Sequence, residues 1–227
     1  MPRTFVLIHS PLVGPATWAP LVEVFAQRGV ATVTPDLDGD ETRDEALWGQ
    51  HVRAAASRLR GAEGAILVGH SGAGALLPAI SAAAGLRPSG YIFVDAGLPA
   101  ATPRKGAGSF AAFLDDLHAR GGRFPDWNDE SLSELVPDPT RRRALLAELR
   151  PQPPRFWEEV VPVFSGWPDA PCGYLRFVPG PGYAEAADEA RQRAWPVRDI
   201  TGGHFHMLVD PGSVADALAS IVDELRR

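Results

Sequence analysis

The amino-acid sequence predicts an α/β fold: a doubly wound, mostly parallel six-stranded sheet with helices on both faces and a helical cap insertion. Three observations point to this fold class. First, six short apolar runs are rich in Val, Ile and Phe and continuous rather than alternating, which is typical of strands covered on both faces. Second, helical patterns lie between runs, and strand–helix alternation with short links is typical of parallel sheets. Third, the alternation stops between residues 98 and 169.

The predicted strands are bounded by Gly, Pro or polar residues. They are Thr4–His9, Ala31–Pro35, Ala65–Gly69, Tyr91–Asp95, Gly173–Val178 and Pro196–Ile200. Helices are predicted over residues 18–25, 44–59, 74–84 and 214–225 from the spacing of their apolar positions. The segment 74–84 is small and apolar on all sides, so we expect that helix to be buried under the sheet.

Residues 98–169 are predicted to form the cap, and residues 1–97 and 170–227 the α/β core. The insertion has helical patterns over 109–119, 140–149 and 156–160, Pro-rich links and no convincing strand. Because it follows a sheet strand, it should lie over the carboxyl edge of the sheet, where ligands bind in open α/β folds. The alternative is a plain helical subdomain whose aromatic residues only fill its own core. These aromatic residues are Phe110, Phe113, Phe124, Trp127, Phe156, Trp157, Phe164 and Trp167.

The composition narrows the function classes. The chain has 227 residues, 45% of them hydrophobic, and its 22 Lys+Arg against 28 Asp+Glu give a net charge of −6. This acidic balance argues against a nucleic-acid partner, and we interpret the run Arg141-Arg142-Arg143 as a solvated helix face. A lone Cys172 cannot form an internal disulfide and fits a reducing cytoplasm. The apolar run at the start is too short for a signal peptide, and none approaches the roughly 18 residues of a membrane span. We therefore expect a cytoplasmic protein with a small-molecule substrate and no membrane partner, as a monomer or a homodimer.

A nucleophile candidate follows the third predicted strand, which runs into Gly69-His70-Ser71-Gly72-Ala73 and then a helix. A residue at a sharp strand-to-helix turn is held in a strained conformation that only small neighbours allow. The Gly72 amide would lie at the start of the helix, where it could donate to an oxyanion. The alternative is a serine N-cap in a Gly-rich turn.

These residues resemble the nucleophile elbow Gly-x-Ser-x-Gly of the α/β-hydrolase superfamily, with Ala73 in place of the last glycine. The resemblance covers essentially the whole chain, with the cap as the variable part, and looks closest to the small esterase and hydroxynitrile-lyase-like branch. Further matching features are His9 with Trp18 nine residues on, the turn Pro35-Asp36-Leu37 with Gly39, and Gly202-Gly203-His204-Phe205 with Asp210-Pro211.

A serine hydroxyl needs a general base near neutral pH, and the resemblance assigns that role to His204. His206, two residues on, could compete. The superfamily usually places its acid after the strand here predicted at 173–178, but that loop offers no carboxylate before Glu185. Asp95, at the end of the preceding strand, is therefore the predicted acid, with Glu185 or no acid as alternatives. No acidic residue or cysteine stands at helpful spacing from the His-x-His pair, so neither a metal nor another cofactor is expected.

The oxyanion hole departs from the family pattern. Ser10 stands where the resemblance implies glycine, and Pro11 stands at the second donor position although proline has no N–H. Either the Leu12 amide donates after a shift of the loop, or the Ser10 hydroxyl substitutes, or Gly72 is the single donor. The predicted substrate contacts are Pro11, His70, Trp127 and Trp157. For His70 the alternative is a structural role, because its side chain should point away from that of Ser71.

The resulting prediction is a serine hydrolase that cleaves an ester or thioester of a small, mostly apolar acid through Ser71, His204 and Asp95. The alternatives are a lyase or isomerase that uses Ser71 and His204 as acid and base, and a ligand-binding protein without turnover. A hydroxynitrile lyase is disfavoured because that branch has a lysine after its histidine, where Phe205 stands here.

Overall fold

A computed structural model describes residues 4–106, 108–180 and 182–226 of the chain. It contains a six-stranded, entirely parallel sheet in the order β2-β1-β3-β4-β5-β6. The strands are β1 (Thr4–Ile8), β2 (Ala31–Val33), β3 (Ile66–His70), β4 (Gly90–Val94), β5 (Cys172–Val178) and β6 (Val197–Thr201). All six predicted strands are therefore confirmed, with small shifts at their ends.

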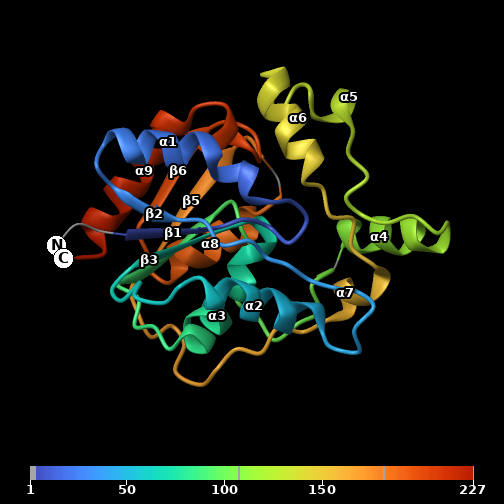
Figure 1. Cartoon of the computed structure of the whole chain (residues 1–227), viewed down its shortest axis with the longest axis horizontal. Helices are drawn as coiled ribbons and strands as arrows, with labels where there is room; N and C mark the ends of the chain where they lie inside the picture. Colours follow the sequence, from blue (N-terminus) through green and yellow to red (C-terminus); the bar gives the residue numbers. More distant parts are fainter. Residues whose placement is uncertain (1–3, 107, 181, 227) are drawn as a thin grey trace.

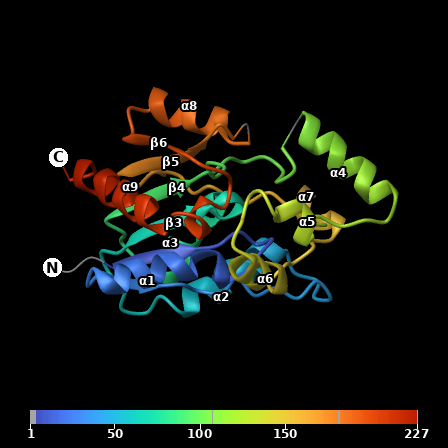
Figure 2. The ribbon, with the colours of Figure 1, turned by 90° about the horizontal axis from the view of Figure 1, so that it is seen from above.

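Helices cover both faces of the sheet, as predicted (Figures 1 and 2). One layer contains α1 (Ala19–Gln27) and α9 (Pro211–Glu224), and the other contains α2 (Leu47–Ser57), α3 (Leu77–Ala84) and α8 (Ala184–Gln192). Short 3-10 segments precede three of these helices: η1 (Pro15–Trp18), η2 (Ser71–Leu76) and η3 (His206–Leu208).

The strands are continuous apolar runs because each face of the sheet has its own core. In β1, Phe5 and Leu7 pack beneath α1 and α9, whereas Val6 and Ile8 point into the layer of α2 and α3. A strand that is buried on both faces can have no polar alternation.

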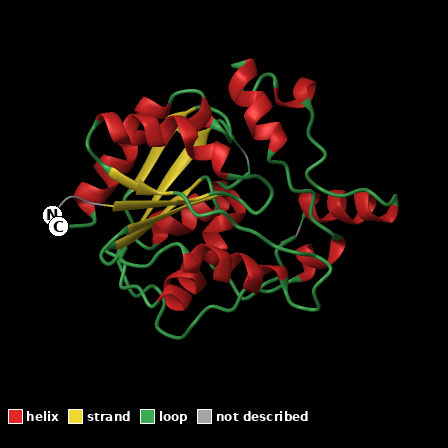
Figure 3. Ribbon diagram, in the orientation of Figure 1, coloured by secondary structure: helices red, strands yellow, loops and turns green. Residues whose placement is uncertain are grey.

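The segment between β4 and β5 lies beyond the carboxyl ends of the strands (Figure 1). Within its described residues it has no strand, only isolated bridges, and its helices are α4 (Ser109–Ala119), α5 (Asp129–Leu132), α6 (Pro139–Ala147) and α7 (Pro154–Glu158) (Figure 3). The sequence patterns predicted three of these helices but not α5, whose four residues begin at a capping box between Asn128 and Ser131.

The interpretation of residues 141–143 as a solvated helix face was wrong for Arg141 and Arg142, whereas Arg143 is exposed. Arg142 is buried, and its Nε and Nη2 donate hydrogen bonds to the two carboxylate oxygens of Asp129 at 2.7 and 3.2 Å. Its Nη1 donates to the carbonyl oxygen of Val136. Arg141 reaches from α6 to the carbonyl oxygen of Leu208. These arginines join parts of the cap to each other and to the core.

Among the described residues, no helix combines the length and the apolar character that a membrane crossing requires.

Candidate active site

Ser71 occupies a strained turn between β3 and η2. Its φ of 56° lies in the left-handed region, which costs a residue with a side chain roughly 1–2 kcal/mol. The turn is crowded, because a Cβ at Gly69 would lie 3.0 Å from Leu77 and 3.2 Å from the backbone of Ala73. Glycine at 69 therefore allows the helix to start directly under the strand end and hold Ser71 in this conformation.

A carboxylate and an imidazole meet beside this turn. Asp95 follows β4, and its Oδ2 lies 2.6 Å from Nδ1 of His204 in the loop after β6. The Asp95 side chain is buried, and its Oδ1 accepts a 3.4 Å hydrogen bond from the Phe177 amide of β5. A short contact between Nδ1 and a buried carboxylate is a charge-assisted hydrogen bond that orients the ring. It leaves Nε2 of His204 as the nitrogen that can exchange a proton with a substrate or a serine.

The other candidates for acid and base lie elsewhere. Glu185 is exposed in the first turn of α8. His206 packs edge-on against Phe177, and its Nε2 lies 3.5 Å from Ser213 Oγ in α9. The structure thus brings Asp95, and not Glu185, to His204.

The assignment of His70 as a substrate contact was wrong. Its side chain is fully buried, and its Nε2 lies 2.8 Å from the carbonyl oxygen of His204, to which it can donate. Burial lowers the pKa of His70 well below its usual value, so the ring is neutral. The rings of His70 and His204 also lie 4.4 Å apart. His70 therefore supports the loop that carries His204.

Tyr183 was not among the predicted site residues, and the structure places it beside Ser71. Its hydroxyl lies 3.1 Å from Ser71 Oγ, and its ring stacks on that of His204 at 5.7 Å. Burial raises the pKa of the Tyr183 phenol, which therefore stays protonated at neutral pH. A signal was available: between Val178 and Glu185, Tyr183 is the one residue with a polar side chain. The loop in which the resemblance implies an acid thus supplies a phenol to the serine.

The oxyanion loop forms a turn in which the Val13 amide donates to the Ser10 carbonyl oxygen at 3.1 Å. The Leu12 amide points at Ser10 Oγ, at 3.4 Å. A Cβ on Gly72 would lie 3.5 Å from the same Oγ and 3.6 Å from Pro11. The Ser10 hydroxyl therefore lies between the Leu12 amide and Gly72, the residue that follows Ser71.

Cap and core residues hold this loop in place. Gln152 Nε2 donates to the Pro11 carbonyl oxygen at 2.8 Å, and the Arg150 amide donates to that of Leu12 at 2.9 Å. Before the loop, His9 Nδ1 lies 2.8 Å from the carbonyl oxygen of Ser10. His9 therefore helps to hold the start of this loop.

Seven of the eight cap aromatic residues, all but Phe164, fall into three groups. Phe110, Phe113, Phe124, Phe156 and Trp157 pack mainly against one another, with Leu12 of the oxyanion loop in the same apolar cluster as Phe156 and Trp157. Trp127 contacts Phe205, the neighbour of His204, at 5.5 Å. Trp167 instead packs against Phe93 and Trp195, outside this cap cluster. Phe124, Phe156 and Trp157 thus belong to a core of the cap, Phe110 and Phe113 are exposed, and Trp127 lies next to the residue that follows His204.

A parallel sheet with a strained serine after β3 and an Asp–His pair at the ends of β4 and β6 defines an α/β-hydrolase fold. The chain belongs to the alpha/beta hydrolase family, whose sequence profile matches residues 5–217. No curated protein sequence matches the chain.

Solved structures share this fold at low sequence identity. One is an extracellular alpha/beta-hydrolase from a Paenibacillus species, described as sharing structural and functional homology with tobacco Salicylic Acid Binding Protein 2. It has 18% identity and a TM-score of 0.75 over 97% of this chain and 99% of that one. Tomato Methylketone Synthase I in complex with 2-tridecanone has 16% identity and a TM-score of 0.72 over 99% of both chains. A pyrethroid hydrolase from Sphingobium faniae JZ-2 has 22% identity and a TM-score of 0.69 over 98% of both.

Proposed function

We propose that this protein is a serine hydrolase that cleaves an ester or thioester of a small, mostly apolar acid. The observation that carries the proposal is the 2.6 Å contact between Asp95 and His204 beside a serine held at φ 56°. A carboxylate that holds Nδ1 sets the tautomer in which Nε2 can accept a proton. The family membership is consistent with this chemistry and leaves the substrate open.

In the proposed reaction, Ser71 Oγ attacks the carbonyl carbon while its proton passes to Nε2 of His204. Asp95 stabilises the imidazolium that forms. His204 then gives the proton to the leaving alcohol or thiol, and a water molecule cleaves the acyl-enzyme by the same path.

The oxyanion that develops on the carbonyl needs donors already in place. We assign one to the Gly72 amide at the start of η2 and the second to the Ser10 hydroxyl. Because Ser10 Oγ accepts from the Leu12 amide, its own hydrogen is free to point at the oxyanion. This arrangement replaces the backbone donor that Pro11 cannot supply.

The test combines a fluorophosphonate probe with turnover of p-nitrophenyl butyrate. The wild type should be labelled and should turn over the ester, Ser71→Ala should do neither, and Ser57→Ala, a change at an exposed serine of α2, should behave as the wild type. His204→Ala should lose activity as Ser71→Ala does, since the two residues act as one unit, whereas His206→Ala should keep it. Labelling without turnover would contradict the proposal in favour of a lyase or isomerase, and the absence of both would favour a binding protein.

A further inference from the structure

A second group of polar atoms lies between the cap and α2. The segment that carries Arg104 runs beside the end of α7, with the Arg104 amide donating to the Glu159 carbonyl oxygen at 3.1 Å. The Arg104 guanidinium lies over the Phe156 ring, 4.5 Å from its centre. Its Nε and Nη2 are buried and have no hydrogen-bond partner among the residues that the structure describes.

This is an unusual state for a guanidinium. Burial lowers the pKa of Arg104 to about 10, so the group still carries its charge at neutral pH. A buried charge without a partner is strongly unfavourable, and buried charges in proteins are nearly always paired. The Arg104 side chain as a whole is half-buried, and it is the Nε and Nη2 edge of its positive charge that is enclosed without an anion.

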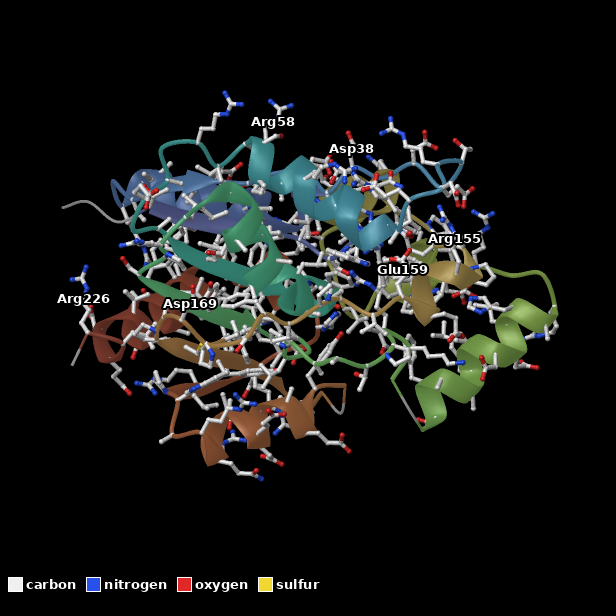
Figure 4. All side chains as sticks on the ribbon, turned by 90° about the horizontal axis from the view of Figure 1, so that it is seen from below. Asp38, Arg58, Arg155, Glu159, Asp169 and Arg226 are labelled. Carbon is white, nitrogen blue, oxygen red and sulfur yellow. The ribbon has the colours of Figure 1, made fainter. Side chains whose placement is uncertain are left out.

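Glu159, the carboxylate whose charge acts on Arg104, already has other hydrogen-bond partners. Glu159 lies between α7 and α2 (Figure 4), where its two oxygens accept hydrogen bonds from the Leu47 and Trp48 amides at 2.7 and 2.9 Å. It therefore caps the start of α2. Its charge favours protonated Arg104 at a distance, but no hydrogen bond reaches the Nε and Nη2 edge.

The positions of Nε and Nη2 indicate which kind of anion this edge would bind. Nε and Nη2 are the two nitrogens with which Arg142, in the same cap, holds both oxygens of Asp129. Two parallel N–H bonds from a guanidinium match the two oxygens of a carboxylate. In Arg104 the same fork is formed and buried, and among the described residues no side chain fills it.

The surroundings fit a small organic anion. His51 packs edge-on against Phe156, its Nδ1 is buried without a partner among the described residues, and burial with the charges of Arg104 and Arg150 lowers its pKa to about 3. Trp157 also contacts Phe156 and has an unpartnered, buried indole N–H. On the side of His51 and Leu47, a hollow of about 160 Å³ lies between α2 and residues 150–153, and Arg104 is not one of its lining residues. Phe156 thus lies against the guanidinium, and unpartnered polar atoms of His51 and Trp157 lie next to the Phe156 ring.

We propose that Arg104 anchors a binding site for a small carboxylate ligand between the cap and α2, through the Nε and Nη2 edge of its guanidinium. The carboxylate could belong to the substrate or to a free ligand. The substrate version rests on the proposed hydrolase activity, whereas the binding site itself does not.

The first experiment measures binding and needs no catalysis. Hexanoate is titrated by calorimetry into wild-type protein and into Ser71→Ala, with hexanamide as the neutral counterpart. We expect both proteins to bind hexanoate and not hexanamide. Arg104→Met should weaken binding by about ten- to a hundredfold, the effect of losing a charge-assisted pair of hydrogen bonds.

Two further variants distinguish the paired hydrogen bonds of the Arg104 guanidinium from the effect of positive charge alone. Arg104→Lys keeps the charge but not the planar fork, and should bind hexanoate more weakly than the wild type and more tightly than Arg104→Met. Lys105→Met removes a positive charge at the adjacent position and should leave the affinity unchanged. Equal hexanoate affinity in wild type and Arg104→Met, or no hexanoate binding to the wild type, would overturn the proposal.

The second experiment identifies the source of the carboxylate. Mono-p-nitrophenyl adipate carries a carboxylate on its acyl chain, and p-nitrophenyl hexanoate does not. If the carboxylate belongs to the substrate, Arg104→Met should raise KM for the first ester about tenfold or more and leave the second unchanged. Loss of hexanoate binding with an unchanged KM assigns the site to a free ligand. If neither ester is hydrolysed by the wild type, the proposed function fails, and the calorimetry still decides the carboxylate site.

Discussion

Replacement of Asp95 by Asn tests the Asp–His pair with little disturbance of the fold. Asp95 has a φ of 41°, in the left-handed region, where Asn is among the best tolerated residues with a side chain. The two side chains have nearly the same shape, so the buried site stays filled. What changes is the charge next to His204 and the kind of hydrogen bond that reaches Nδ1.

The Phe177 amide determines how an Asn side chain at position 95 would be oriented, and therefore how much kcat should fall. This N–H donates to Asp95 Oδ1, so the oxygen of an Asn side chain should remain there and its NH2 group should face His204. Nδ1 of His204 must then accept, its proton moves to Nε2, and the ring can no longer take the proton of Ser71. A wrong tautomer of this kind lowers kcat about 10⁴-fold, which corresponds to roughly 5.4 kcal/mol.

The assay is steady-state turnover of p-nitrophenyl butyrate by Asp95→Asn, with the melting temperature and circular dichroism as checks of the fold. Glu185→Gln is the matched control, because it makes the same chemical change at the exposed alternative acid and should alter kcat less than twofold. A folded Asp95→Asn protein that keeps a tenth or more of the wild-type kcat would refute the reasoning.

Three other predictions follow from the same contacts. Ser10→Ala should lower kcat on p-nitrophenyl butyrate about 10²- to 10³-fold, because it removes an oxyanion donor. Pro11→Ala should change kcat less than tenfold, because other contacts hold the loop. If Pro11→Ala has the larger effect, the second donor is a backbone amide and not the Ser10 hydroxyl. Tyr183→Phe should raise kcat/KM about two- to tenfold, because a ground-state hydrogen bond to Ser71 of roughly 0.5–1.5 kcal/mol is lost; a fall of tenfold would instead make the phenol part of catalysis. Asp36→Asn should flatten the acid limb of a stability–pH curve measured by urea unfolding. A hydrogen bond with His9, aided by Arg150, lowers the pKa of Asp36 from 3.8 to about 2, so the Asp36 carboxylate stabilises the fold above about pH 4 and loses this effect as the pH falls toward 2. Because the carboxylate is partly exposed, the free energy of unfolding of the two proteins should differ by at most about 1 kcal/mol. Identical acid limbs in both proteins would contradict this prediction.

Local patterns in the sequence were sufficient for the strands and for the turn that carries Ser71. A strand buried on both faces must be apolar at every position, and a strand-to-helix turn around Ser71 needs glycine at 69, so both leave a signal within a few residues. Parallel strands end at one edge of the sheet, which is why Asp95 and His204 could both be predicted to lie there.

The tertiary structure decided which of those residues touch. Asp95 and His204 are 109 positions apart, and the choice of Asp95 over Glu185 depends on where α8 begins after β5. The contact of Tyr183 with Ser71 and the unpartnered edge of Arg104 were not predictable from any local pattern, and only the packing of His70 behind His204 decided between its two predicted roles. Each of them depends on packing between segments distant in the chain, and a side chain's partners are set by the backbone that surrounds it, not by its own neighbours in sequence.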